Sequence, residues 1–428
     1  MNRRSFRAWH RDARIVALAS MLTALVMGAA HAERLVIGVV LPDAEVGTVL
    51  ERAVAVSAQQ GAEMVAFEFA FNAEMFGLDF EIVVGRANDP AAARAAATNL
   101  VDEHEAFAVV GGFGAGVAEA LARWSTERGV PFLNVGSADD ALRNEACEPS
   151  TFHVEPSAAM YVDGLAGWYV RSGLRRWYVV HTDDGAGEAL RARAAWSLSE
   201  RHFGARIVGS RAVPAGGGDV AGVAAAARRA NADLIVMLLS AEDQLAWLRG
   251  LDDAGVETLV AGFPFVEAQT RTFFQAARDA SVRLGASFRT LAFEATLDAY
   301  GARELNARYR QQFGQPMDPP AWAVYQAVKM LFEAATFGGS LEPDAVRGYF
   351  TAPTTVFDLY KGIGTSFRPW DRQLRQSIYL VSLSATDPDP FSMAVLVGEL
   401  PAIYMPGSEV LERLDQIGDL GARSRCTR

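Results

Sequence analysis

The sequence predicts an α/β protein made of two lobes, each with a parallel β-sheet covered by helices. Short apolar runs of strand length alternate with longer segments of helical period, which is typical of βαβ crossovers. The alternation restarts near residue 158, so two units of similar build follow one another along the chain. At 428 residues, the chain is long enough for two lobes of ordinary size.

The first unit extends to about residue 153. Its strands are expected at the apolar runs 35–41, 80–84, 107–110 and 130–134, and its helices at 49–72, 90–101 and from residue 117. Asp89 or Asn88 is the expected N-cap of the second helix, because either side chain can accept a hydrogen bond from the first helical turn. Pro90 suits the first helical position.

The second unit repeats this order. Helices are expected at 158–171, after the turn 183–187, at 220–230 and from residue 243, and strands at 177–181, 206–213, 234–239 and 258–261. The turns between them contain aspartate and glycine, such as the Gly-rich turn that ends at Asp219. Aspartate favours helix starts and glycine favours turns, so both residue types support these boundaries.

Two loops of the first unit mark a ligand-binding edge. The strand ending at Val110 is followed by a loop that contains Gly112 and Phe113, and the next strand ends at Asn134 before a small and acidic loop. In open parallel sheets, ligands bind beyond the carboxyl ends of the strands. The glycine loop fails the dinucleotide pattern G-x-G-x-x-G in both registers, since Val117 and Glu119 occupy the third glycine position.

The N-terminus has the features of an export signal. Five arginines precede an apolar run from Ile15 to Met27, and cleavage is expected after Ala32. A twin-arginine signal is an alternative to the ordinary secretory type, because Arg3-Arg4 precedes Ser5 and Phe6. No other stretch is long and apolar enough to span a bilayer. We therefore expect a periplasmic protein without direct membrane insertion.

The charge balance excludes some partners. Loss of the five arginines and one aspartate of the signal would take the net charge from −11 to −15, and only Lys329 and Lys361 are lysines. Such an acidic chain is not expected to bind nucleic acid or anionic membranes. Cys147 and Cys426 are the only cysteines, and an oxidising compartment would permit a disulfide between them. Two unpaired thiols are the alternative.

Several motifs, in their order and spacing, resemble type I periplasmic solute-binding proteins of the leucine/isoleucine/valine-binding family of ABC transporters. The motifs are Ile37 to Pro42, Gly61-Ala-Glu63 with Asn72, Asn88-Asp89-Pro90, Val180-His181 with Gly187-Glu188, and Trp322 with Tyr325-Gln-Ala327. The resemblance extends to about Ser384 and implies a Venus flytrap fold, in which two Rossmann-like lobes are joined by a three-strand hinge.

Mapped onto this chain, the resemblance puts the three crossings near residues 153–156, 290–294 and 357–361. Lobe 1 would then comprise residues 33–153 and 291–357, and lobe 2 residues 154–290 and 358–384, followed by a C-terminal extension, residues 385–428. Three segments also resemble a branch of the family associated with quinoprotein (pyrroloquinoline quinone, PQQ) alcohol oxidation. They are Leu142-Arg143 with Cys147, His153 to Ser157, and Phe367 to Gln376.

The side chains with which this family binds an amino acid are not retained at the matching positions of this sequence. The family's serine position corresponds to Ala115 here, and its threonine position to Ala138, or to Ser137 after a shift of one residue. The two tyrosine positions correspond to Ala186 and to about Ser240. The position of the family's carboxylate lies near Phe263. A site that loses such partners loses roughly 1–3 kcal/mol for each unsatisfied group. We therefore expect that the ligand is not a branched-chain amino acid.

Acidic side chains occur at the strand ends instead. Asp139, Asp184 and Glu242 are expected to face the cleft, where they would suit a cationic, polyol or metal-bearing ligand. Helix capping is the alternative, and it is the expected role of Asp89 and Asp183. Phe113 and Phe263 would be apolar walls of the cleft, or core residues.

The resulting interpretation is the substrate-binding component of an ABC importer, which captures a small solute and passes it to an inner-membrane permease with its ATPase. No cofactor, metal site or catalysis is expected, since motifs such as G-x-S-x-G, the P-loop and H-E-x-x-H are missing from the sequence. The alternatives are a periplasmic sensor or chaperone linked to quinoprotein alcohol oxidation, and a periplasmic α/β enzyme that uses Asp139 or Asp184.

Overall fold

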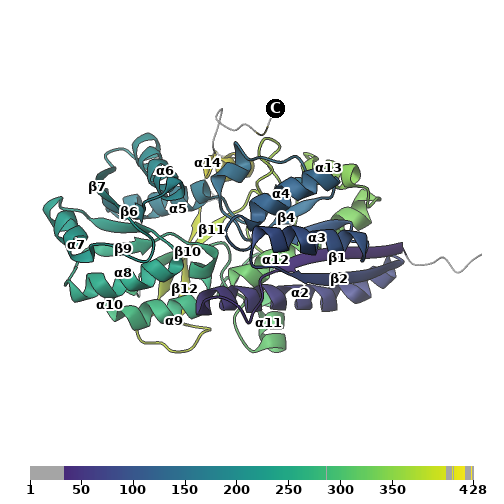
Figure 1. The fold of residues 1–428 in the computed structure, drawn as a ribbon, viewed down its shortest axis with the longest axis horizontal. Coiled ribbons are helices and arrows are strands. Elements are labelled where there is room, and N and C mark those ends of the chain that lie inside the picture. The colour runs from purple at the N-terminus through teal and green to yellow at the C-terminus, as the bar shows by residue number, and fades with distance from the viewer. Residues whose placement is uncertain (1–32, 286, 402–406, 408, 420–425, 427–428) are drawn as a thin grey trace, which may run out of the picture.

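The computed structural model describes residues 33–428 apart from 286, 402–406, 408, 420–425 and 427–428. The expected signal peptide lies outside the described residues. The chain forms two α/β lobes with a smaller sheet between them (Figure 1), so the predicted fold class is confirmed. In the described part of the chain, no helix combines the length and the apolar character needed to cross a membrane.

Lobe 1 is built on sheet A, a parallel sheet with strand order β2-β1-β3-β4-β5. Its strands are β1 (Glu33–Leu41), β2 (Leu78–Arg86), β3 (Ala108–Gly111), β4 (Phe132–Asn134) and β5 (Thr151–His153). Its helices are α2 (Val49–Met75), α3 (Pro90–Asp102), α4 (Val117–Arg128), α11 (Ala302–Phe313), α12 (Pro319–Gly338) and α13 (Pro343–Thr351), with the short 3-10 helix η1 (Asp140–Arg143).

Both faces of sheet A are covered, and the two-residue period of β1 divides its side chains between two cores. Ile37 and Val39 pack into the core that contains residues of α2 and α12. Val36 and Val40 pack into the core that contains residues of α3 and α4. A strand buried on both faces needs a continuous apolar run, and β1 has one. The layers therefore hold the carboxyl ends of β1 and β3 in fixed positions.

Lobe 2 is built on sheet B, a parallel sheet with strand order β7-β6-β8-β9. Its strands are β6 (Arg176–Thr182), β7 (Arg206–Val213), β8 (Leu234–Leu238) and β9 (Leu259–Gly262). Its helices are α5 (Ala158–Arg171), α6 (Gly185–Arg201), α7 (Val220–Arg229), α8 (Ala241–Asp253), α9 (Arg271–Ala280) and α10 (Val282–Gly285), with the 3-10 helix η2 (Val266–Gln269).

Most predicted elements of this half lie where expected. The predicted helix 158–171 and strand 206–213 coincide with α5 and β7. The helix predicted from residue 243 begins two residues earlier, because the Ser240 hydroxyl accepts a hydrogen bond from the Asp243 N–H and caps the first turn.

Sheet C joins the lobes through three antiparallel strands in the order β10-β11-β12. They are β10 (Phe288–Leu291), β11 (Ile378–Leu383) and β12 (Ala394–Leu400). β12 lies within the segment that the sequence suggested as an extension, so part of that segment completes the sheet between the lobes. The short helix α14 (Val410–Gln416) follows it.

The chain passes between the lobes after β5, after β10 and before β11. Phe357, Phe367 and Leu374 still belong to the core of lobe 1, and Gln373 pairs with His153 at the edge of sheet A. The third passage therefore lies just before Ile378, later than the crossing expected near residues 357–361. The reason is the apolar character of Phe367 and Leu374, which the core of lobe 1 buries.

Cys147 and Cys426 form a disulfide with a Cα–Cα distance of 5.4 Å and a sequence separation of 279 residues. Cys147 lies between η1 and β5, so the bond fastens the end of the chain to lobe 1. Cross-links that close long loops constrain the unfolded chain most strongly.

Candidate functional site

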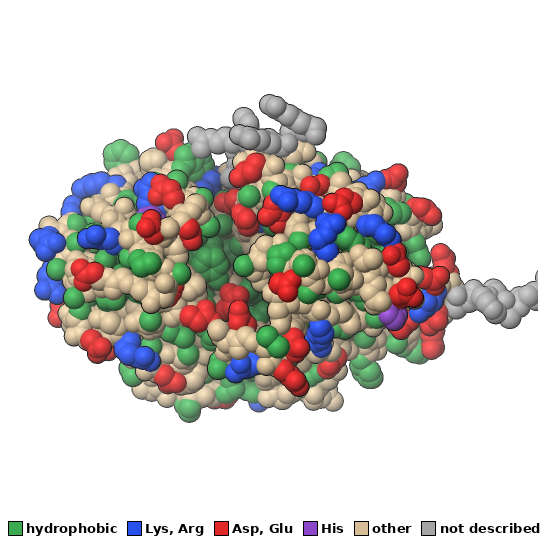
Figure 2. Space-filling view, in the orientation of Figure 1, with side chains coloured by type: hydrophobic (Ala, Val, Ile, Leu, Met, Phe, Trp, Pro, Cys, Tyr) green, Lys and Arg blue, Asp and Glu red, His purple; other side chains and the backbone are tan. Residues whose placement is uncertain are grey.

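The space between the lobes is the main hollow on the face shown in Figure 2, with apolar side chains at depth and acidic side chains at its lower rim. A cavity of about 250 Å³ lies there. Its lining comes from the carboxyl end of β1, the start of α2, the loop after β3, and one residue of lobe 2: Pro42, Val46, Gly47, Glu51, Val54, Asn88, Phe113, Gly114 and Glu267. The edge of sheet A expected to bind a ligand thus borders a partly open cavity.

The glycine loop after β3 forms the apolar wall of this cavity. Gly112 has φ +106°, and a Cβ on it would lie 2.6 Å from Oδ1 of Asn134. The Asn134 amide donates to the Ser137 carbonyl (2.7 Å) and accepts from the Ser137 N–H (3.0 Å), which shapes the loop after β4. The Val135 N–H donates to the Gly111 carbonyl (2.8 Å), which ties this loop to the end of β3. Phe113, only 3% exposed, is thereby held against the cavity.

Three carboxylates from both lobes gather at the other side of the cavity. Thr48 caps α2 in a capping box with Glu51, and the Thr48 hydroxyl also donates to Oε1 of Glu242 across the lobes (2.7 Å). Burial raises the pKa of Glu267, and the nearby charges of Glu242 and Glu51 raise it further. A positive charge placed among these groups would relieve their mutual repulsion.

Of the predicted residues of lobe 1, Phe113 lines the cavity, and Gly112 precedes it in the same loop. Ala115 is exposed in the loop that precedes α4. Ser137 supplies backbone groups to Asn134, whereas the Ala138 carbonyl accepts from the N–H of Ala158 (2.6 Å) and joins the start of α5.

Several predicted polar residues cap helices. Asp139 accepts from the Ala141 N–H at η1, Asp184 from the Gly187 N–H at α6, and Ser240 caps α8. The capping role predicted for Asp89 is confirmed, since it accepts from two N–H groups of α3. The same prediction for Asp183 is wrong, because the neighbouring Asp184 occupies the N-cap position.

Phe263 is buried in the core of lobe 2, 1% exposed, with its ring 6.0 Å from Tyr161 and 4.6 Å from Phe265. Glu242 is the predicted acidic residue that contacts the other lobe. Sequence reasoning missed Glu51 and Glu267. The capping-box pattern Thr48-x-x-Glu51 could have identified the first, but no local pattern marks Glu267, which lies in a short 3-10 helix.

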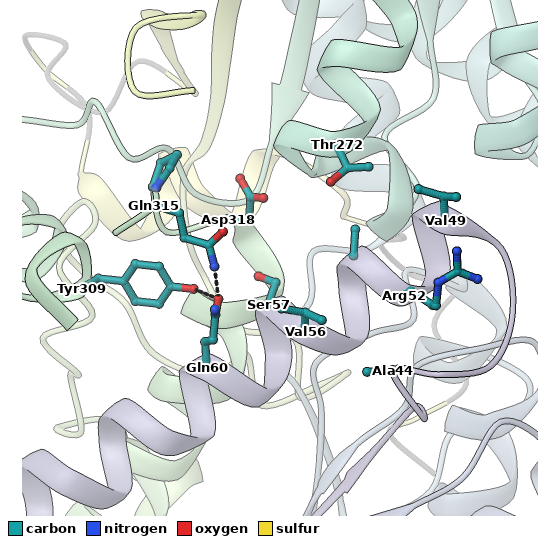
Figure 3. Close-up of a pocket in the computed structure, with 12 residues that line it drawn as sticks. Ala44, Val49, Arg52, Val56, Ser57, Gln60, Thr272, Tyr309, Gln315 and Asp318 are labelled. Carbon is teal, nitrogen blue, oxygen red and sulfur yellow. Dashed lines mark hydrogen bonds between the residues drawn. The ribbon is translucent and has the colours of Figure 1, made fainter. Parts of the chain in front are cut away.

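A second cavity of about 380 Å³ lies on the other side of α2 and is also lined by both lobes. Figure 3 shows Tyr309 and Gln315 pointing at Gln60 of α2; the Tyr309 hydroxyl donates to its Oε1 (2.7 Å), and Gln315 Nε2 donates to the same atom (2.5 Å). The other polar residues of the lining are Thr272 of α9, Asp318 before α12, and Arg52 and Ser57 of α2.

Beside this cavity, Arg271 at the start of α9 joins the lobes. Its guanidinium donates to Glu294 (2.6 and 3.2 Å) on the second passage and to Asp318 (3.3 Å). All three side chains are largely buried, with exposures of 8%, 0% and 14% for Arg271, Glu294 and Asp318. Burial raises the pKa of Asp318 to about 6, although Arg271 opposes this shift.

Buried polar groups also connect the three passages. Tyr161 donates to Glu155 (2.7 Å), which lies on the first passage, and Gln269 donates to the Tyr161 hydroxyl (2.9 Å). Lys361 donates to the carbonyl of Ala292 on the second passage and to Gln376 (2.8 Å) on the third. Burial raises the pKa of Glu155 to about 7 and lowers that of Lys361 to about 7. The hinge therefore contains ionisable groups with little access to water.

Among the described residues, no group of three or more His, Cys, Asp or Glu side chains is arranged to hold a metal ion. The cleft can instead offer carboxylates, an aromatic wall and the backbone of a glycine loop to an organic ligand. Such a composition is usual for small-molecule sites, which are mainly apolar with a few polar groups.

Comparisons with known proteins support this assignment of the fold. The model of a family described as "Periplasmic binding protein" matches residues 35–388. No curated protein matches the chain by sequence. The family match covers most of the chain, which therefore belongs to the periplasmic binding protein family. The expected resemblance to the type I proteins of branched-chain amino acid ABC transporters is confirmed, and the PQQ-associated branch stays a prediction.

Solved structures of the same fold include a branched-chain amino acid ABC transporter periplasmic ligand-binding protein from Burkholderia xenovorans (TM-score 0.73, 17% identity, 85% of this chain and 95% of that chain). Another is a branched-chain amino acid transporter substrate-binding protein from Streptococcus pneumoniae in complex with isoleucine (0.68, 20%, 85% and 99%). A third is an ABC transporter solute-binding protein from Rhodopseudomonas palustris in complex with 3,4-dihydroxybenzoic acid (0.67, 17%, 87% and 99%).

Proposed function

We propose that this periplasmic binding protein captures a small solute between its lobes and presents it to an ABC importer in the inner membrane. The observation that carries the proposal is the cavity between the lobes, bordered by Phe113 and Gly114 of lobe 1 and by Glu267 of lobe 2. A ligand that touches both lobes binds the closed arrangement better than an open one, and so shifts the population that a permease would recognise.

We further propose that the ligand is an organic cation with a short apolar part. Glu51 and Glu267 border the cavity, Glu242 lies close to Glu267, and Phe113 supplies an apolar wall. An ammonium group would be stabilised by these carboxylates, whereas the carboxylate of a benzoate-type ligand would be repelled. A polyol would gain hydrogen bonds but no charge attraction, and a metal ion would lack a suitable ligand set among the described residues.

A branched-chain amino acid fits this cavity poorly. Ala115 falls at the family's serine position, and Ala138, or Ser137 after a shift of one residue, falls at its threonine position. Asp184 and Ser240 use their side chains as helix caps. The loop after β3 could still offer backbone N–H groups, but a zwitterion would bring its carboxylate close to the same acidic groups. We therefore keep the expectation that leucine, isoleucine and valine are not the ligands.

The test compares molecules that differ by one charged group. The mature protein is screened by thermal shift against leucine, its decarboxylated amine 3-methylbutylamine and the matching acid 4-methylpentanoate, and against benzylamine and benzoate. The amines should raise the melting temperature in a concentration-dependent way, as mass action requires, and the acids should not. Glu267→Gln should abolish the effect, while Glu63→Gln on the outer face of α2 serves as the matched control.

The outcomes separate the two parts of the proposal. Binding of leucine or benzoate would contradict the cationic ligand and leave the receptor role intact. If a cell that lacks the protein imports the bound amine at an unchanged rate, this result would contradict the receptor role and favour a sensor or chaperone. Chemical turnover of a bound amine that is lost in Asp139→Ala or Asp184→Ala would favour the enzyme alternative.

A further inference from the structure

The outer face of α2 carries large apolar side chains that nothing in the described chain covers. Phe67, Phe71 and Met75 are 77%, 69% and 74% exposed, and their spacing of four residues places them in one row on the helix. Phe76 (51% exposed) and Phe337 (65% exposed) continue the row, with their ring centroids 6.0 Å apart. We call these five residues the α2 apolar face.

The size of this face is unusual for a surface that stays in water. At roughly 200 Å² for a side chain of this kind, the exposed fractions amount to roughly 700 Å² of apolar surface. Monomeric proteins rarely expose continuous apolar patches beyond a few hundred Å². Stable two-partner contacts bury about 800 Å² on each side, so this face with a polar rim matches the area that one protomer contributes.

The position of the face leaves the ligand cleft free. It lies at the carboxyl end of α2, where the Gly77 carbonyl accepts from the N–H of Glu33 (3.3 Å) and where β1 and β2 begin. The cavity lies at the opposite, carboxyl ends of the strands of sheet A. A partner bound to the α2 apolar face would therefore neither block the cleft nor restrain the movement of lobe 2.

We propose that the mature protein forms a two-fold symmetric homodimer through the α2 apolar face. In such a dimer, the same patch of each copy packs against that of the other, so no second patch is required. The rim of the face is acidic, with Glu63 and Glu74 exposed on the same helix, and the chain has a net charge of −11. An anionic membrane surface is therefore a poorer partner than a second copy, in which the acidic groups can stay at the hydrated rim.

The test measures the mass of the mature protein by sedimentation equilibrium from about 1 to about 200 µM, a range that covers micromolar dissociation constants. The wild-type protein should associate to a dimer, and Phe71→Asp should weaken the dimer at least about 100-fold, because the buried carboxylate would be unpaired. Phe203→Asp is the matched control, since Phe203 is 97% exposed on lobe 2, far along the chain from this face.

Each result decides the proposal. A dimer that is kept by Phe203→Asp and lost by Phe71→Asp, with unchanged circular dichroism and melting temperature, supports it. A wild-type protein that stays monomeric over the whole range overturns it, as does a dimer that Phe71→Asp leaves intact. Monomeric protein that sediments with phosphatidylcholine vesicles would overturn it too and would assign the face to a lipid surface.

Discussion

The two lobes follow the same strand–loop–helix plan, but they use the loops at the cleft differently. In lobe 1, the loop after β3 contains Gly112, Gly114 and Gly116, all with positive φ, and α4 begins without a side-chain cap. In lobe 2, the loops after β6 and β8 are short, and Asp184 and Ser240 cap the helices that follow.

The difference indicates a division of roles. Lobe 1 offers a preformed wall made of backbone and Phe113, beside which the Val135 N–H of the next strand end donates to the Gly111 carbonyl. In lobe 2, Asp184 and Ser240 are used within their own loops, whereas Glu242 accepts from the Thr48 hydroxyl of lobe 1. The part of the cavity that lobe 2 lines comes from Glu267 in η2. A repeated topology therefore does not imply a repeated set of ligand contacts, since helix capping competes for the same polar residues.

The largest expected effect concerns Arg271 and its two carboxylate partners, which join the two lobes. Arg271→Ala removes the cation that pairs with Glu294 and Asp318 and leaves two carboxylates buried. The free energy of unfolding in urea should fall by about 3–5 kcal/mol. Arg283→Ala, which breaks the exposed pair with Asp252, should cost less than about 1 kcal/mol. Equal losses would show that the junction is not a stabilising contact.

The next prediction tests whether the glycine loop of lobe 1 is special. Gly112→Ala should destabilise the protein by about 2 kcal/mol or more, because alanine disfavours φ +106° and its Cβ would meet Asn134. Gly185→Ala, at the start of α6 in lobe 2, should be neutral or slightly stabilising, since a Cβ there meets nothing within 4 Å. Thermal unfolding of the two variants compares the lobes directly, and similar melting temperatures would refute the comparison.

A third prediction concerns the hinge and its dependence on pH. The pKa of Glu155 is raised to about 7 in the folded protein from an ordinary value of 4.5. Its stabilising contribution is therefore complete below about pH 4.5 and is lost as the pH rises through about 7. Glu155→Gln cannot ionise, so its stability relative to wild type should increase by on the order of 1–3 kcal/mol between pH 5 and pH 8.

The control for the hinge is Glu63→Gln, whose side chain is exposed on α2. Measuring each variant against wild type at each pH cancels the titration of His153, whose pKa burial lowers. The titration of Lys361 is part of the measured effect, because the Glu155 carboxylate raises the pKa of Lys361 and Glu155→Gln removes that charge. A difference between Glu155→Gln and wild type that stays constant with pH would contradict the assignment of a buried, titrating carboxyl group at the hinge.

The smallest expected effect asks whether the lobe 2 loops only cap helices. Asp184→Ala removes the acceptor for the Gly187 N–H and should cost about 1 kcal/mol of stability. If capping is its only role, ligand affinity measured by calorimetry should stay within a factor of two, whereas Glu267→Gln should abolish binding. A large loss of affinity in Asp184→Ala would restore Asp184 to the binding site and remove the asymmetry between the lobes.

The local features of this protein could be predicted from its sequence. Continuous apolar runs such as that of β1 identify strands buried on both faces, and the helices begin at recognisable caps such as Asp89 before Pro90. The glycine loop after β3 and Phe113 within it were also identifiable, because glycines after a buried strand mark a close approach of the backbone. These features depend on residues that are neighbours in the sequence, so the sequence alone determines them.

The tertiary structure decided what meets at the cleft. Thr48 and Glu242 are 194 residues apart, and Glu267 faces α2 from a short 3-10 helix that no periodicity marks. It also decided that Asp139 and Asp184 cap helices, that Phe367 and Leu374 stay with lobe 1, and that β12 completes sheet C. Contacts of this kind depend on how the lobes are packed. An aspartate or glutamate at a strand end is equally compatible with helix capping and with ligand binding until that packing is known.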